Sequence, residues 1–210
     1  MRKLSESYIY SPSDLITFME SEYVSWMDRF HLEFPDAAQP DEEKGEDRVV
    51  RARGEEHERA FFKELAGAGH DILNLKGAKD PLTATLQAMR TGREIIYQGA
   101  LALGSFAGIA DFLVRVEGAS AFGDYHYEVW DTKLARKPKP YFIIQLCCYA
   151  EMLAGIQQRL PKEVEVVLGT NERRRFRTED YFYYYRSLKL AFLERQAGFD
   201  RDDPPDIPAP

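Results

Sequence analysis

Two aspartates and a lysine lie in neighbouring stretches that have the pattern of β-strands, residues 106–116 and 125–134. Asp131 and Lys133 are two residues apart, so on a strand their side chains share one face. Asp111 interrupts an apolar run on the preceding strand, where a carboxylate is costly to bury unless a cation satisfies it. Together the three side chains could place two hard oxygen ligands and an ammonium group around one divalent ion. The alternative is a partly exposed ion pair of Asp131 and Lys133, which contributes little.

Three further polar residues occupy helix faces that are otherwise apolar. The inward stripe of a helix predicted over 48–65 consists of Val50, Gly54, His57, Phe61 and Leu65. A lone histidine on such a face is more often a packed core residue than a ligand. Gln145 and Tyr149 are four residues apart and therefore share a face of a later helix. Hydrogen bonding within the core is the alternative to a functional role for this second pair.

The helices and strands that hold these residues are predicted from the spacing of apolar residues and from the residues that typically begin or end such elements. Ser11-Pro12-Ser13-Asp14 is a helix-start signal, and apolar residues then recur at helical spacing as far as Met27. Residues 34–47 are rich in proline, glycine and acids and predict a mobile loop. Strands are predicted at 94–103, 106–116, 125–134, 164–169 and 173–177, the last at a sheet edge, and helices at 48–65, 81–89, 141–157 and 180–197. This order predicts an α/β fold with a mixed central β-sheet flanked by helices.

Composition sets the class of protein. The chain has 210 residues, of which 44% are hydrophobic and 30% charged, so it can bury a core and is not a disordered or collagen-like chain. No stretch has the apolar length of a membrane span, and the first residues lack the apolar run of a signal peptide. The two cysteines, Cys147 and Cys148, are adjacent, which makes a poor structural disulfide. We therefore expect a cytoplasmic protein in a reducing compartment, with no membrane partner.

The charge is distributed unevenly along the chain. A net charge of −7 argues against a general phosphate-binding surface. Residues 131–177, however, carry ten basic and five acidic side chains. This local excess is compatible with an anionic partner such as a nucleic-acid backbone, whereas charge taken alone favours a solvated surface of mixed sign.

Four short motifs occur in a fixed order: Gly54-x-x-His57-Glu58, Gly108-x-x-Asp111, Asp131-x-Lys133 and Gln145-x-x-x-Tyr149. Their order, spacing and predicted placement on helix, strand, strand and helix resemble the RecB-type nuclease domain of the PD-(D/E)XK superfamily. Each motif is weak alone, and the four in order are fairly specific. The resemblance covers roughly residues 8–197. It implies a restriction-endonuclease-like core in a nuclease domain of residues 1–198, followed by a flexible proline-rich tail, 199–210.

The resemblance implies metal-dependent hydrolysis of phosphodiester bonds, with DNA favoured over RNA as the partner. By this analogy Asp111, Asp131, the backbone carbonyl of Thr132 and His57 ligate Mg²⁺ or Mn²⁺. Lys133 orients or deprotonates the attacking water and stabilises charge on the scissile phosphate. The implied substrate-binding residues are Gln145 and Tyr149, which brace the substrate backbone or Lys133, and Arg136, Lys137 and Lys139, which contact phosphates. A fused or associated helicase, or another DNA-processing protein, is the implied protein partner.

The sequence departs from relatives of this family that hold an iron–sulfur cluster. Ser21 stands about where their first cysteine falls, and no cysteine follows Cys148, so we expect no such cluster. Two alternatives to a nuclease remain at this point. One is a catalytically inactive nucleic-acid-binding module of the same fold. The other is an interaction protein that docks through its aromatic helix, although helix–sheet packing is the preferred explanation of those tyrosines.

Overall fold

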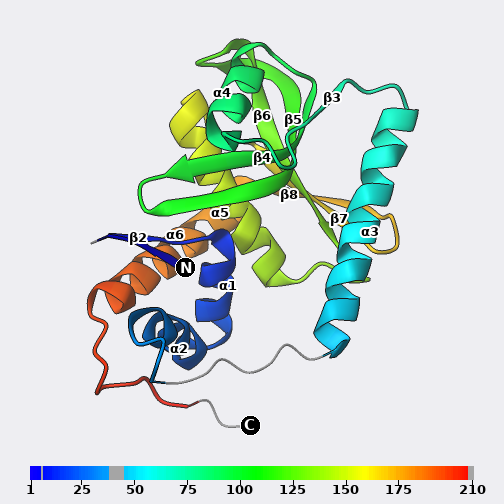
Figure 1. Cartoon of the computed structure of the whole chain (residues 1–210). Helices are drawn as coiled ribbons and strands as arrows, with labels where there is room; N and C mark the ends of the chain where they lie inside the picture. The colour runs from blue at the N-terminus through cyan, green and yellow to red at the C-terminus, as the bar shows by residue number, and fades with distance from the viewer. Residues whose placement is uncertain (6, 38–44, 208–210) are drawn as a thin grey trace.

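The structure, a computed structural model, describes residues 1–5, 7–37 and 45–207 (Figure 1). Its described strands form one six-stranded sheet and a separate two-stranded ribbon. In sheet order the six are β3 (Ile72–Asn74), β4 (Ile95–Leu103), β5 (Phe106–Ser120), β6 (Gly123–Lys133), β7 (Glu163–Leu168) and β8 (Arg173–Arg177). β4, β5 and β6 form an antiparallel meander, whereas β3 pairs with β4, and β6 with β7, in parallel. The sheet is therefore mixed, which confirms the predicted α/β class.

Helices cover both faces of this sheet. They are α1 (Pro12–Glu20), α2 (Glu22–Glu33), α3 (Gly45–Gly67), α4 (Pro81–Arg90), α5 (Pro140–Gln157) and α6 (Thr178–Ala197). α5 contacts β4 to β7 on one side and α1 and α6 on the other, which explains why it is apolar nearly all round. Among the described helices, α3 alone packs against the opposite side of the sheet, where it contacts β6 and also reaches β7 and β8 (Figure 1).

The sheet separates two apolar cores of unequal size. The larger core lies on the α5 side and includes Leu113, Val129 and Phe192. The smaller core lies under α3, where Phe61 packs edge-on against Phe112, with ring centroids 5.2 Å apart. Only the C-terminal half of α3 takes part: Phe61 and Leu65 are buried, whereas Val50 is 60% exposed. The prediction that Val50 faces inward is therefore wrong, because the helix extends beyond the sheet at its N-terminal end.

The remaining predicted elements are found with shifted ends. The predicted helix start at Ser11 is confirmed by a capping box with Asp14, but the helix ends at Glu20 because Ser21 caps a second helix, accepting from the Val24 amide at 3.2 Å. The helix predicted from 48 begins at Gly45, and residues 38–44 of the predicted loop lie outside the described part of the chain. The edge position of β8 is confirmed. Three strands of three residues each were not predicted: β1 (Arg2–Leu4), β2 (Ser7–Ile9) and β3.

Arg29 joins the N-terminal ribbon, α2 and the segment after α6. Its guanidinium group lies 3.6 Å from the centre of the Tyr8 ring and 5.1 Å from that of Phe199. It also donates to Glu33 at 2.8 Å and to the backbone carbonyl of Gln196 at 3.3 Å. The first residues of the predicted tail thus dock on α2, and no regular element follows α6 in the part of the chain described.

Cys147 and Cys148 are buried within α5, as expected of core thiols. Burial raises the pKa of each thiol to about 12, so neither is poised to react. Across the described residues, no helix combines the length and the apolar character needed to cross a membrane.

Candidate functional site

Asp131 and Lys133 pair with each other at the end of β6, as their spacing predicts. Lys133 Nζ lies 2.8 Å from Asp131 Oδ2, and the two side chains are 23% and 6% exposed. The pair is therefore mostly buried rather than a surface ion pair. Oδ2 is the oxygen that faces this ammonium group, so Lys133 is the cation that satisfies the buried carboxylate.

Burial dominates the ionisation of this pair. It raises the pKa of Asp131 to about 7; the attraction of Lys133 opposes the shift, and the negative charge of Asp111 adds to it. For Lys133, burial lowers the pKa, but the attraction of Asp131 outweighs this and the net pKa is raised. Lys133 therefore remains an ammonium group at neutral pH.

Asp111 lies against the same end of β6. Its Oδ2 atom accepts hydrogen bonds from the backbone amide and the hydroxyl of Thr132, each at 2.9 Å. The strand order places β5 directly beside β6, so the two aspartates approach each other from adjacent strands. The structure thus brings together the acids and the lysine that the sequence singled out.

A bend in the β4–β5 hairpin presents Asp111 to this site. In β4, Ile96 and Leu101 both face the larger core although they are an odd number of residues apart; in β5, Ala110 and Leu113 do the same. The alternation of faces therefore reverses within both strands. The reversals coincide at Gln98 and Asp111, which lie opposite each other between the pairs Tyr97–Phe112 and Gly99–Ala110.

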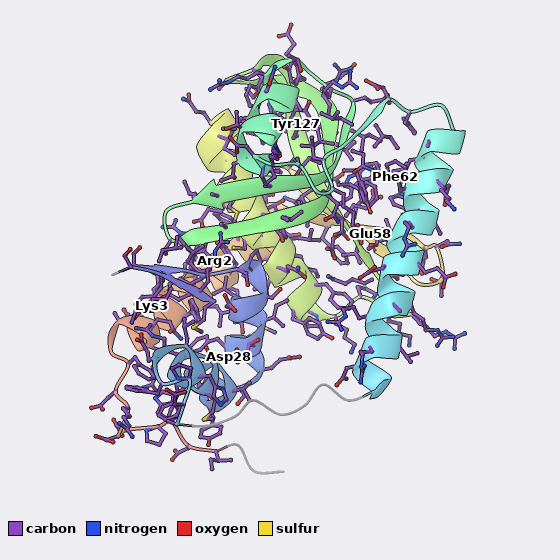
Figure 2. All side chains as sticks on the ribbon, in the orientation of Figure 1. Arg2, Lys3, Asp28, Glu58, Phe62 and Tyr127 are labelled. Atoms are coloured by element: carbon purple, nitrogen blue, oxygen red, sulfur yellow. The ribbon has the colours of Figure 1, made fainter. Side chains whose placement is uncertain are left out.

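Glu58, on α3, is a third acid in this neighbourhood. Its carboxylate accepts a hydrogen bond from the side-chain amide of Gln98. Burial first, and then the charge of Asp111, raise the pKa of Glu58. Figure 2 labels Glu58 on the side of α3 that faces the sheet. The sequence motif contains this residue without giving it a role, but its position three residues before the buried Phe61 indicates that it faces inward.

His57 points elsewhere. Its Nε2 atom lies 3.4 Å from the backbone carbonyl of Val167 on β7, and the side chain is half-buried. No three His, Cys, Asp or Glu residues are grouped so as to hold a metal ion within the described ranges. The structure therefore does not place His57 in a ligand set with Asp111 and Asp131, and its metal-binding role stays a prediction.

Tyr149 supports β5 instead of facing a substrate. It is 5% exposed, and its hydroxyl donates to the backbone carbonyl of Ile109 at 2.8 Å. Gly108 permits this contact, because a Cβ atom there would lie 2.9 Å from the same hydroxyl. Tyr149 thus braces the strand that carries Asp111, and its expected role in bracing the substrate or Lys133 stays a prediction. Gln145, one turn earlier on α5, is half-buried.

The basic residues after β6 remain free for an external partner. Arg136, Lys137 and Lys139 are exposed and form no ion pair with another described residue. By contrast, Arg173 and Arg175 on β8 are both paired with the buried Glu165, and Arg174 pairs with Glu172. The positive charge of this region is therefore largely neutralised on β8, whereas the basic side chains between β6 and α5 have no acidic partner among the described residues.

No protein-family model matches the chain, and no curated protein matches it. Among solved structures, that of SSO0001 aligns over 91% of this chain and 78% of its own, with 11% sequence identity and a TM-score of 0.39. A likeness at this level carries no argument about fold or function, so the conclusions below depend on the residues of this chain.

Proposed function

We propose that this protein is a metal-dependent nuclease with a restriction-endonuclease-like core, acting on DNA in preference to RNA. The observation that carries the proposal is the buried pair of Asp131 and Lys133, with Asp111 held beside it by Thr132. A cluster of acids with one ammonium group at the end of two strands is a combination that can hold a divalent cation and stabilise charge during phosphodiester hydrolysis.

The donor set suits a hard divalent cation. Asp111 and the buried Asp131 supply carboxylates, and the backbone carbonyl of Thr132 is the proposed third ligand. These are oxygen donors of the kind that Mg²⁺ and Mn²⁺ prefer. When bound, the cation supplies Lewis acidity and lowers the pKa of a coordinated water.

Lys133 is the positively charged side chain of the proposed site, in addition to the bound metal ion. While Asp131 has no other cation, its carboxylate holds the Lys133 ammonium group at 2.8 Å. Once Asp131 is satisfied otherwise, the ammonium group is available to orient a water and to stabilise negative charge on the phosphate. Arg136, Lys137 and Lys139 lie just beyond it and hold the nucleic-acid backbone through phosphate contacts.

The test is cleavage of labelled single- and double-stranded DNA and RNA with Mn²⁺, with Mg²⁺ and with EDTA. We expect cleavage of DNA with either metal and none with EDTA, and Asp131→Asn prepared in parallel guards against a contaminating nuclease. Wild-type protein that cuts no better than Asp131→Asn would reject the proposal.

A catalytically inactive nucleic-acid-binding module is the second candidate. It is favoured by the closed contact between Lys133 and Asp131 and by the lack of a three-residue metal cluster in the described ranges. Binding of DNA that depends on Arg136 and Lys137, without metal-dependent cutting, would identify this function.

A further inference from the structure

Lys133 has a second contact besides its ion pair with Asp131. Its Nζ atom lies over the ring of Phe142, 5.5 Å from the ring centroid. The face of an aromatic ring carries partial negative charge and attracts a cation that lies within about 6 Å of the centroid. The ammonium group therefore has two partners that attract it, the carboxylate of Asp131 at 2.8 Å and the face of this ring.

The ring of Phe142 is held in a fixed place. Phe142 lies in the first turn of α5, which begins at Pro140, and its backbone amide donates to the carbonyl of Lys139 at 3.0 Å. The residue is 6% exposed, and its ring packs edge-on against that of Tyr141, with centroids 4.7 Å apart. A lysine, by contrast, carries its charge on a flexible stem. The ring is therefore the fixed member of this contact and Lys133 the movable one.

The neighbouring ring holds a different lysine. Lys139 Nζ lies 5.4 Å from the centroid of the Tyr141 ring, so two consecutive rings at the start of α5 hold one lysine each. Lys139 is exposed, whereas the Lys133 side chain is only 23% exposed. A ring attracts a cation more strongly where water is excluded, so the contact with Phe142 is the one that should restrain its lysine.

The ring becomes important when Asp131 has another partner. This carboxylate is the nearest counter-charge of Lys133, and in the proposed function it binds a metal ion. Asp111 also attracts Lys133, but it belongs to the same proposed ligand set. A mostly buried ammonium group without a counter-charge is costly, and its flexible side chain turns toward solvent unless another group attracts it. The face of Phe142 is a partner that stays in place whatever the two acids bind.

We infer that Phe142 is a positioning residue for Lys133: its ring holds the ammonium group at the site once Asp131 no longer does. This inference rests on the proposed function, which gives Asp131 another partner and gives the ammonium group a charge to stabilise. The role goes beyond the apolar packing that places Phe142 in the larger core.

The first experiment is made without metal or nucleic acid. Asp131→Asn removes the counter-charge of Lys133 and keeps the side-chain volume. A proton over the face of a ring gives an NMR signal at low chemical shift, so the ε-methylene signals of Lys133 should stay at low chemical shift in this variant. Adding Phe142→Leu should move them to the values of a solvent-exposed lysine. The signals are identified by their absence when Lys133→Arg is added to Asp131→Asn.

Two results of this experiment would overturn the inference. One is that Asp131→Asn alone gives the signals of a solvent-exposed lysine, because the ring would then fail to hold Lys133. The other is that the signals do not move when Phe142→Leu is added, because another group would then hold the lysine.

The second experiment weakens the charge on the ring face and keeps the shape of the ring. Phenylalanine with one, two or three fluorine atoms replaces Phe142, since fluorine withdraws electrons from the ring and adds little volume. With each added fluorine kcat should fall, to roughly a tenth with three, while KM and the melting temperature stay close to wild type. Equal kcat across the series would overturn the inference, because a ring that only packs does not depend on its charge.

Phe106 supplies a matched control. Lys189 pairs with Glu151 and lies 4.8 Å from the centroid of the Phe106 ring, so a lysine, an acid and a ring meet there as well. Phe106 is 1% exposed and begins β5. The same fluorinated residues at position 106 should leave kcat unchanged. An equal fall of kcat at both positions would overturn the positioning role of Phe142.

The two experiments separate this inference from the proposed function. Cleavage by the wild type, together with the signals of a solvent-exposed lysine in Asp131→Asn, would overturn the inference and leave the nuclease standing. A wild-type protein that cleaves no nucleic acid would reject the nuclease and, with it, the effect of Phe142 on kcat. Signals at low chemical shift in Asp131→Asn would still show that the ring holds Lys133.

Discussion

Asp131 carries its charge in surroundings that oppose it. It is buried, two other acids lie within electrostatic range, and a lysine is its nearest counter-charge. A carboxylate in such a position binds a proton or a cation more readily than one on the surface. The same burial that makes the charge costly therefore makes the ionisation of Asp131 sensitive to pH and, in the proposed function, to a bound metal ion.

Substitution of Asp131 and substitution of Lys133 should impair different steps, metal binding in the first case and catalysis in the second. Asp131→Asn removes an anionic ligand without removing side-chain volume, so it should abolish cleavage and weaken Mn²⁺ binding while the fold remains. Lys133→Ala should bind Mn²⁺ normally but lower kcat by roughly 100-fold, as loss of a charge-stabilising or proton-transferring group does. Calorimetry and single-turnover kinetics measure the two effects. Full activity in Asp131→Asn would remove this residue from the site.

The raised pKa of Asp131 predicts how stability depends on pH. The folded protein keeps this proton up to about pH 7, whereas the unfolded chain loses it near the ordinary value of 3.8. Since the folded state binds the proton more tightly, its free energy of unfolding should fall as pH rises between these two values. Asp131→Asn cannot titrate there and should gain stability relative to wild type over that interval. Denaturant unfolding of the two metal-free proteins at several pH values in this range measures the difference in stability. If the free energy of unfolding of wild type and of Asp131→Asn changed with pH in parallel, the raised pKa of Asp131 would be contradicted.

Residue spacing predicted some of this site and could not predict the rest. The distance of two residues on a strand was enough to pair Asp131 with Lys133. The place of Glu58 depends on where α3 packs, and the left-handed conformation of Gln98 has no local signal, since the glycine of this segment is the next residue. The burial of Tyr149 follows from Gly108, whose small size matters only once α5 lies against β5.

At the scale of elements, the length of each helix or strand and the residues at its ends decided whether it could be predicted. α5 begins at Pro140 and is apolar nearly all round, and β4 to β6 are long, so their patterns are unambiguous. β1, β2 and β3 have three residues each, too few to show a period of two. The division between α1 and α2 is a single capping residue, Ser21, inside a continuous apolar pattern.

Arg29 is the residue through which the N-terminal and C-terminal elements support each other. Arg29→Ala should lower the free energy of unfolding by about 3 kcal/mol, because Glu33 loses a buried partner and the Tyr8 and Phe199 rings lose their contact. Arg195→Ala is the matched control. It removes an exposed ion pair, in which Arg195 Nε lies 3.1 Å from Glu22 Oε2, and it should change the free energy of unfolding by about 0.5 kcal/mol or less. Denaturant unfolding compares them, and equal effects would contradict a special role for Arg29.

At the scale of the whole molecule, the sheet divides a large core from a small one. The large core joins α1, α5 and α6 to the sheet, whereas the small core holds α3 alone. α3 can therefore open while the sheet and the other helices stay folded. Since α3 carries His57 and Glu58, such opening would loosen one wall of the site without unfolding the protein.

Two phenylalanine truncations should separate the cores. Phe61→Ala should lower the free energy of opening α3 by about 3 kcal/mol. Amide hydrogen exchange should therefore become faster along α3, while the amides of β4 to β6 keep their protection. Phe192→Ala, in the large core, should instead speed exchange throughout the sheet. Hydrogen exchange resolved by peptide distinguishes the two patterns. Identical patterns would mean that the molecule opens as one unit.

The paired bend of β4 and β5 also restricts how the gene can change in length. Losing one codon from an ordinary strand turns every later side chain to the wrong face. Here each strand already contains one such reversal, at Gln98 and at Asp111. Losing either codon alone would straighten one strand against a bent partner, and losing both would give a regular hairpin without its aspartate. We therefore expect descendants of this gene to exchange apolar residues around the bend freely, but to conserve the number of residues on both sides of it.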